Sequence, residues 1–240
     1  MIRLDSVSHV YGRRDAQVRA LDDVSLELRT GTFTAVMGPS GSGKTTLLHC
    51  AAGMDRPTRG SVWWDGTQVS RLPERELAVC RRDRVGFVFQ AFNLIPSMTV
   101  AQNVALPSRL AGTRVDADTV RRALEHVGLA DRARHRPAQL SGGQQQRAAI
   151  ARALVGRPRL VFADEPTGAL DRRTGHEILS LLRAGVDDIG QTCVMVTHDP
   201  LAAGYADRVV VLEDGAVVDN LDRPSATHLA ARLGAGLGAA

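Results

Sequence analysis

The fold of this 240-residue chain is decided by Gly38-Pro39-Ser40-Gly41-Ser42-Gly43-Lys44-Thr45-Thr46. The stretch fits the pattern G-x-x-x-x-G-K-S/T and lies between an apolar run, Phe33 to Met37, and a helix-like segment, Leu47 to Ala52. Its glycines allow successive backbone N–H groups to point inward, and the following helix adds the positive end of its dipole. A plain flexible turn has no need of a lysine followed by a hydroxyl residue. The stretch therefore predicts a loop that binds a polyphosphate.

Lys44 is the only lysine of the chain, although lysine and arginine together number 30. Elsewhere the chain uses arginine for its positive charge. A compact ammonium fits between phosphate groups better than a planar guanidinium does. The composition thus supports the same interpretation of the loop.

The bulk composition indicates a globular protein. The apolar content is 44%, which suffices for a sizeable core. The net charge of +4 permits contact with nucleic acid or an anionic membrane surface. However, the arginines are spread along the chain and form no block of five or six like charges, so a solvated surface is favoured and no nucleic-acid partner is expected.

No membrane-spanning or export segment is evident. The chain has no run of eighteen uncharged apolar residues, and residues 1–5 lack the apolar region of a signal peptide. We therefore expect a cytoplasmic protein that does not itself cross a membrane. Its cysteines, Cys50, Cys80 and Cys193, are far apart and odd in number, which favours reduced packing residues over a disulfide or a metal site.

The N-terminal part has the patterns of antiparallel strands. Apolar and polar residues alternate from Ile2 to Asp5 and from Val24 to Arg29. The segment Ser61 to Thr67 contains Asp-Gly, which is typical of a hairpin turn, and both tryptophans, which should face opposite ways. A charged surface helix is predicted from Leu72 to Arg82, with Pro73 in its first turn.

Polar residues follow three buried strands of the predicted sheet. Gln90 follows the run from Arg84 to Phe89, and His198 follows the run from Thr192 to Thr197. Asp164 and Glu165 end the apolar run that begins at Leu160. In doubly wound sheets ligands bind at the carboxyl ends of the strands. Two carboxylates there are costly unless they serve a cation or a reaction, so these residues are site candidates.

An α-helical insertion is predicted from Ala91 to about Gly156. Apolar residues recur at helical spacing through Val100–Leu110 and Val115–Val127, and no convincing strand is present. The insertion ends with Leu140-Ser141-Gly142-Gly143-Gln144-Gln145-Gln146-Arg147 and an alanine-rich helix, Ala148 to Leu154. Ser141 is either a simple helix N-cap or part of a second phosphate-binding device.

These patterns predict one α/β domain. Its core comprises about 1–90 and 157–221, its helical subdomain about 91–156, and its C-terminal tail 222–240. A last strand pair is expected at Val209–Leu212 and Val217–Val218. After Pro224 the tail is either a weak helix or disordered.

The order and spacing of these motifs resemble the ATP-binding subunit of an ABC transporter. The resemblance extends from the first strand to about Asp219, and the Ser-Gly-Gly-Gln element separates this family from other phosphate-loop NTPases. It implies a phosphate-loop NTPase core of the RecA-like type with an antiparallel β subdomain and an inserted α-helical subdomain. It also implies an ATPase that uses ATP and Mg²⁺.

The resemblance implies a role for each candidate residue. Lys44 and the loop from Gly38 to Thr46 would bind the phosphates of ATP, and Thr45 and Asp164 would hold Mg²⁺. Glu165 would be the general base, and His198 would contact the γ-phosphate and the attacking water. Gln90 would link the metal to the helical insertion, and Tyr11 would stack on the adenine.

The resemblance also implies two partners. Ser141, Gly142, Gly143 and Gln144 would meet the γ-phosphate of a second copy, so that two ATP molecules lie between head-to-tail protomers, with Asp171 near the junction. The second partner is a separate integral membrane permease, contacted through a groove beside Gln90 and the segment 91–107. The chain would then lie on the inner face of the cell membrane.

Longer stretches of the sequence resemble one branch of this family in particular. Residues 53–58, 87–96 and 140–147 look like the branch that serves macrolide export, lipoprotein release and cell division, although Ala169 replaces an asparagine that many members carry. An efflux or force-transmitting motor is the leading hypothesis. A regulatory subunit of a cell-envelope or division complex, without net transport, is the alternative. A DNA-repair or translation ATPase is disfavoured, because the chain has neither a long coiled-coil insertion nor a second ATPase domain.

Overall fold

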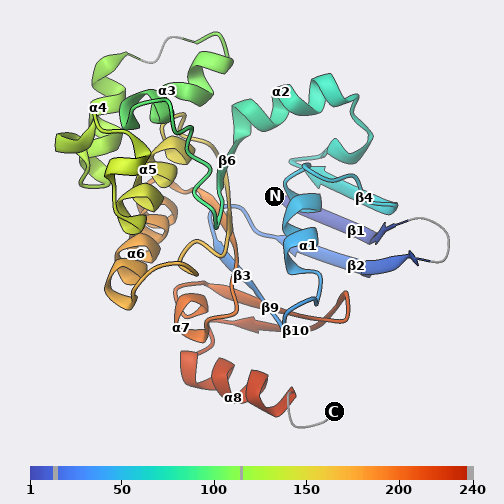
Figure 1. The fold of residues 1–240 in the computed structure, drawn as a ribbon. Coiled ribbons are helices and arrows are strands. Elements are labelled where there is room, and N and C mark those ends of the chain that lie inside the picture. The colour runs from blue at the N-terminus through green and yellow to red at the C-terminus, as the bar shows by residue number, and fades with distance from the viewer. Residues whose placement is uncertain (13–15, 114–115, 237–240) are drawn as a thin grey trace.

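A six-stranded sheet forms the centre of the computed structural model, which describes residues 1–12, 16–113 and 116–236 (Figure 1). Its five adjoining parallel strands confirm the predicted α/β core, and an antiparallel strand completes one edge. The order across the sheet is β10 (Ala216–Asp222), β9 (Arg208–Glu213), β3 (Phe33–Met37), β8 (Thr192–Val196), β7 (Leu160–Asp164) and β6 (Val85–Val88).

Alternate residues of these strands face two separate hydrophobic cores. On β3, Ala35 packs into one core and Val36 into the other, and on β7 the same holds for Val161 and Phe162. Successive side chains of a strand point to opposite faces, so continuous apolar runs mark strands that are covered on both sides. Both faces of the sheet are therefore buried.

The first face is covered by the antiparallel subdomain and α1 (Lys44–Ala51). The subdomain has the order β2 (Val18–Leu28), β1 (Ile2–Tyr11), β4 (Arg59–Trp64) and β5 (Thr67–Gln68). As predicted, the two tryptophans of β4 face opposite ways. Trp64 is buried and its Nε1 donates to the carbonyl of Ala51 at 2.8 Å, whereas Trp63 lies under the guanidinium of Arg3.

The surface helix α2 (Glu74–Arg84) begins and ends two residues later than predicted. Pro73 was expected in its first turn but precedes the helix, with an extended backbone at φ −52° and ψ 145°. Because proline fixes φ but leaves ψ free, it serves equally well just outside a helix start. The predicted helix was thus displaced by two residues, which is about half a turn.

The second face of the sheet is covered by helices (Figure 1). The described residues between β6 and β7 contain helices and no strand, namely α3 (Val100–Leu110), α4 (Ala117–His126), α5 (Gly142–Leu154) and short 3₁₀ turns at 130–132 and 137–139. Two further helices, α6 (Arg172–Ile189) and α7 (Pro200–Ala203), belong to the same layer. Val115, where a helix was expected to begin, lies outside the described residues. None of the described helices is long and apolar enough to cross a membrane.

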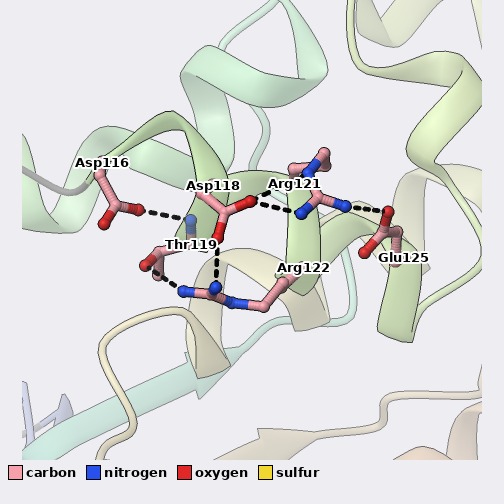
Figure 2. Close-up of polar contacts among 6 residues, drawn as sticks. All are labelled: Asp116, Asp118, Thr119, Arg121, Arg122 and Glu125. Atoms are coloured by element: carbon pink, nitrogen blue, oxygen red, sulfur yellow. Dashed lines mark hydrogen bonds and ion pairs between the residues drawn. The ribbon is translucent and has the colours of Figure 1, made fainter.

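Exposed arginines of α4 are paired with carboxylates of the same helix, as Figure 2 shows. Asp116 caps the helix by accepting from the Thr119 N–H at 2.5 Å, Asp118 contacts Arg121 and Arg122, and Arg121 donates to Glu125. Exposed pairs of this kind contribute little to stability. They agree with the prediction that the arginines lie on a solvated surface.

The C-terminal tail forms a helix, α8 (Ala226–Gly236), which settles the earlier alternative for the described residues. Leu229 of α8 is buried in the same core as the helices of the second face. The strand before it, β10, ends at Asp222, four residues later than expected. Residues 237–240 lie outside the described part of the chain.

Candidate active site

The glycine-rich loop connects β3 to α1 and requires glycine at specific places. Gly38, Gly41 and Gly43 have positive φ, which other residues rarely adopt. A Cβ at Gly43 would lie 2.1 Å from the carbonyl oxygen of Ala20, and one at Gly38 would lie 2.0 Å from that of Leu212. The loop is thus pressed between the two sheets, and side chains are excluded from these positions.

Backbone N–H groups of the loop are left without protein acceptors. Among the described residues, the amides of Gly41, Gly43, Lys44, Thr45 and Thr46 donate no hydrogen bond, and the first intrahelical bond of α1 comes from Leu47 to Gly43. They surround a depression of about 310 Å³, lined by Ala20, Ser40, Gly41, Gly43, Lys44, Thr45, Thr46, Glu165 and Val196. Unpaired N–H groups at the positive end of a helix bind anions. The arrangement fits a phosphate chain.

The other residues of the loop shape it. Ser42 is buried, its N–H donates to Pro39, and its carbonyl accepts from the N–H of Gly215 in the β9–β10 turn. Gly38 lies against Leu212 of β9. Gly38, Pro39 and Ser42 therefore hold the loop in place, whereas the other residues of the loop line the depression.

Lys44 lies at the mouth of the depression beside both carboxylates. Its Nζ donates to the carbonyl of Pro39 at 2.6 Å, so the ammonium is folded over the loop. Burial lowers the pKa of Lys44, and the nearby charges of Glu165 and Asp164 oppose that shift. An anion that enters the depression would stabilise the charged form of this partly buried ammonium.

Thr45 and Asp164 are joined by a hydrogen bond beside the phosphate loop. The Thr45 hydroxyl donates to Oδ1 of Asp164 at 3.2 Å. Burial raises the pKa of Asp164, and the hydrogen bond from Thr45 opposes the shift. Mg²⁺ binds such oxygen ligands in small number and takes the others from water and phosphate. The described residues contain no group of three or more His, Cys, Asp or Glu side chains that could hold a metal ion.

Glu165 and His198 meet at the carboxyl ends of β7 and β8. Oε1 of Glu165 lies 2.8 Å from Nδ1 of His198. The Glu165 N–H donates to the carbonyl of Val196, and its φ of 44° turns the carboxylate toward the phosphate loop. Glu165 is largely buried, whereas the His198 side chain is 71% exposed. A buried carboxylate oriented by a histidine is a suitable base for a water molecule in the depression.

Gln90 lies beside the segment that follows Glu165. A Cβ at Gly168 would lie 3.3 Å from Nε2 of Gln90 and 3.6 Å from Cβ of Glu165. The loop after Gln90 is held by Arg152 of α5, whose guanidinium donates to the carbonyls of Phe92 and Asn93. Gln90 is thus connected both to the Glu165 segment and to the helical layer.

Tyr11 lies over the start of α1. Its hydroxyl is 3.3 Å from Oγ1 of Thr46 and 3.3 Å from Oδ2 of Asp55. His9 contacts the ring edge-on, and the residue is 43% exposed. An aromatic face is therefore available next to the phosphate loop.

The Ser-Gly-Gly-Gln element is not brought to the phosphate loop of the same chain. It starts α5, which packs on the second face of the sheet, while α1 packs on the first (Figure 1). Ser141 caps α5 by accepting from the Gln144 N–H at 3.3 Å. Asp171 caps α6 in the same way through Thr174, which lowers the pKa of Asp171. Neither Ser141 nor Asp171 is among the described residues that line the depression.

Several residues of this region were not predicted from sequence. Asp55 contacts Tyr11, Gly168 contacts Gln90, and Gln146 reaches the segment after Glu165. Gln146 belongs to the motif at 140–147, which was identified from the sequence. However, nothing in the local sequence shows that Gln146, and not Gln144 or Gln145, makes this contact.

Comparison with known proteins places these features in context. A family model described as "ABC transporter" matches residues 21–168. The chain is 48% identical over 220 residues to a macrolide export ATP-binding/permease protein, MacB 1/2, of Paracoccus denitrificans; the match covers 91% of this chain and 33% of that protein. The chain therefore spans about one third of the length of that relative.

A second relative has nearly the same extent. The uncharacterized ABC transporter ATP-binding protein MJ0796 of Methanocaldococcus jannaschii is 45% identical over 223 residues, covering 90% of this chain and 95% of the relative. A solved dimeric structure of a post-hydrolysis state of this cassette, bound to ADP and Pi, is similar with a TM-score of 0.86 and 41% identity. That similarity covers 94% of this chain and 100% of the solved one.

Proposed function

Because this chain belongs to the ABC transporter family, we propose that it is the ATP-hydrolysing subunit of a transport complex. In this proposal it binds and hydrolyses ATP as a head-to-tail dimer and drives a separate membrane permease. The relative named for macrolide export favours efflux or force transmission as the work performed.

The observation that carries the proposal is the depression in which the phosphate loop faces Glu165. The unpaired amides of Gly41 and of residues 43–46 offer donors to the β- and γ-phosphates, and Lys44 adds a charge. Glu165, oriented by His198, would accept a proton from the attacking water. Thr45 and Asp164 are the residues that would hold Mg²⁺, which would neutralise charge on the phosphates. Tyr11 supplies a face for the adenine.

The proposed dimer follows from the separation of the two phosphate-binding elements. The Ser141–Gln144 element and the phosphate loop lie on opposite faces of the same sheet. A second copy, turned head to tail, would place its Ser141 against the nucleotide held by the first copy. The ADP-bound relative of 41% identity is described as dimeric, which supports this arrangement.

The proposed permease contact is a groove between the sheet edge and the helices. It has a volume of about 280 Å³ and is lined by Arg82, Asp83, Val85, Gly86, Phe87, Phe89, Asn93, Pro107, Arg152, Ala153, Gly156 and Pro158. It borders the Gln90 loop, so a segment docked there would sense the site through Gln90. This contact would hold the chain at the inner face of the membrane.

The Glu165→Gln variant tests the proposal. It keeps the loop and the metal ligands but removes the base, so we expect ATP binding with hydrolysis slowed roughly 10²- to 10⁴-fold. Trapped ATP should then hold the dimer, which size-exclusion chromatography with light scattering detects. A variant that binds ATP yet stays monomeric, with its membrane partner as well as alone, would contradict the head-to-tail arrangement.

A further inference from the structure

Gln146 makes a buried contact between the two parts of the proposed composite site. It lies on α5, one turn after Ser141, and its side chain is 0% exposed. Its Nε2 lies 2.7 Å from the carbonyl oxygen of Pro166, the residue that follows Glu165. A carbonyl oxygen can only accept, so the amide nitrogen must be the atom that faces it.

Apart from the contacts of Glu165 with Val196 and His198, the segment from Glu165 to Asp171 is held by its own short turns. The Gly168 N–H donates to Glu165 and the Leu170 N–H to Thr167, both at about 3 Å. Among the described residues, the hydrogen bond that joins this segment to α5 is the one from Gln146. The orientation of the segment relative to α5 therefore depends on this amide.

Steric contact supports the same connection at the start of both helices. A Cβ at Gly143 would lie 2.5 Å from Cγ2 of Thr174, so α5 and α6 touch at their first turns. Thr174 in turn donates through Oγ1 to Asp171 at 2.7 Å. One turn further along, Arg147 pairs with Glu177. The Ser-Gly-Gly element and the Glu165 segment thus form one connected unit.

Gln146 makes one buried hydrogen bond and leaves its other polar atom unpaired. Its Oε1 is buried and has no partner among the described residues. The cost of an unpaired buried acceptor is comparable with, or larger than, the net gain from one neutral hydrogen bond. An apolar side chain of the same size would remove the unpaired Oε1, but it would leave the buried carbonyl of Pro166 without a donor. The hydrogen bond from Gln146 therefore both satisfies this carbonyl and fixes the position of the segment that carries it.

We propose that Gln146 is a positioning residue that couples the Ser-Gly-Gly element to the Glu165 segment of the same chain. The inference rests on the proposed function, in which these two parts act on different ATP molecules of one dimer. When the partner's nucleotide draws Ser141 into place, the bond from Gln146 to Pro166 carries that displacement to Glu165. The amide of Gln146 thereby makes the position of Glu165 in one ATP site depend on the nucleotide bound in the other site.

Gln191 provides a matched control. Its Nε2 donates to the carbonyl of Pro158 at 2.8 Å, and the residue is 4% exposed. The donor, the type of acceptor and the burial are the same as for Gln146. However, Pro158 precedes β7 and Gln191 precedes β8, so this bond lies at the amino ends of these strands, whereas the site lies at their carboxyl ends.

The test compares Gln146→Leu, Gln191→Leu and wild type in steady-state ATPase assays, binding of a fluorescent ATP analogue and thermal melting. We expect Gln146→Leu to lower kcat roughly 10- to 100-fold with KM little changed, because a small misplacement of a catalytic group has effects of this size. Gln191→Leu should melt like Gln146→Leu but keep kcat within about twofold of wild type. A Gln146→Leu enzyme with normal kcat, or equal kcat losses in both variants, would overturn the inference.

Gln146→Glu gives a second readout if Gln146→Leu does not fold. Its ionised carboxylate would face the Pro166 oxygen with no proton to donate, whereas the protonated acid restores the bond. Burial raises a carboxyl pKa, so activity relative to wild type should rise as the pH falls. A ratio that stays flat with pH would overturn the proposal.

Failure of the coupling role and failure of the proposed function give different results. If wild type does not hydrolyse ATP, or Glu165→Gln does not dimerise with ATP, the proposed function fails. If both behave as proposed and Gln146→Leu is fully active, the coupling role alone is wrong.

Discussion

Nδ1 of His198 lies 2.8 Å from Oε1 of Glu165, although the two residues end different strands and are separated by 33 positions in the chain. The parallel pairing of β7 and β8 brings these strand ends together. The carboxylate is buried and the imidazole is exposed, so the histidine covers the base on its solvent side. Through Glu165 the pair borders the same depression as the phosphate loop.

His198→Ala should therefore slow hydrolysis about 10²-fold while leaving ATP affinity nearly unchanged. The alanine removes the group that lies against Glu165 and that, in the proposed function, would contact the γ-phosphate, but it removes no group proposed to bind the rest of the nucleotide. Steady-state ATPase rates and a binding titration measure the two effects. His126→Ala, an exposed histidine at the end of α4, serves as the control. Equal losses in both variants would contradict the role given to His198.

Tyr11 is predicted to bind adenine through its ring and not through its hydroxyl. Tyr11→Leu should weaken ATP binding by roughly 5- to 100-fold, since stacking of a base on an aromatic ring contributes about 1–3 kcal/mol. Tyr11→Phe loses the contacts to Thr46 and Asp55 but keeps the ring, and should bind ATP nearly as wild type does. Fluorescence titration distinguishes them. Similar affinities for Leu and Phe variants would rule out stacking.

The buried thiols should be unreactive in the folded chain. Burial raises the pKa of Cys50 and of Cys193 to about 12, and the thiolate is the reactive form. Cys80 is only half-buried. A thiol reagent at pH 8 should therefore modify Cys80 in the native protein and all three cysteines after denaturation. Rapid native modification of Cys50 or Cys193, seen by peptide mass spectrometry, would show that the packing is looser than described.

Asp207 should stabilise the fold in a pH-dependent way. Partial burial acts to raise its pKa, but the Phe33 N–H and Arg183, both at 2.9 Å, hold the pKa below its usual range. The folded pKa is thus lower than the unfolded one. The stabilisation is complete above the unfolded pKa and is lost as the pH falls through the folded pKa.

Asp207→Asn removes the charge and should cost about 1–3 kcal/mol near neutral pH, because Arg183 loses its charged partner. The difference from wild type should shrink under acid conditions. Urea unfolding at several pH values measures it. Asp222→Asn, an exposed substitution on β10, is the control. A difference that does not change with pH would contradict the pairing.

The sequence was informative where structure is local and less so where contacts cross the fold. The phosphate loop, the apolar strands and the polar residues after them could be predicted because each is a continuous pattern. The α2 boundary was missed because Pro73 is compatible with positions inside and just before a helix. The contact from Gln146 to Pro166 could not be predicted, since it depends on how α5 docks against the end of β7. For Ser141 the sequence allowed a helix N-cap or a phosphate-binding role, and in the structure its hydroxyl caps α5.

The central claim is that each ATP site combines the loop of one chain with the Ser141 element of another. Lys44→Ala and Ser141→Asp test it together. Aspartate is as good an N-cap as serine, so Ser141→Asp keeps α5 intact while placing a negative charge where the partner's γ-phosphate would lie. Each variant alone should be inactive.

The decisive measurement is the ATPase activity of the two variants mixed in equal amounts. A mixed dimer contains one doubly altered site and one intact site, which joins the loop of the Ser141→Asp chain to the Ser141 element of the Lys44→Ala chain. We predict that mixing restores activity, in proportion to the mixed dimers formed. If each site were built within a single chain, every chain in the mixture would remain defective. A mixture that forms dimers yet stays as inactive as its components would contradict the account.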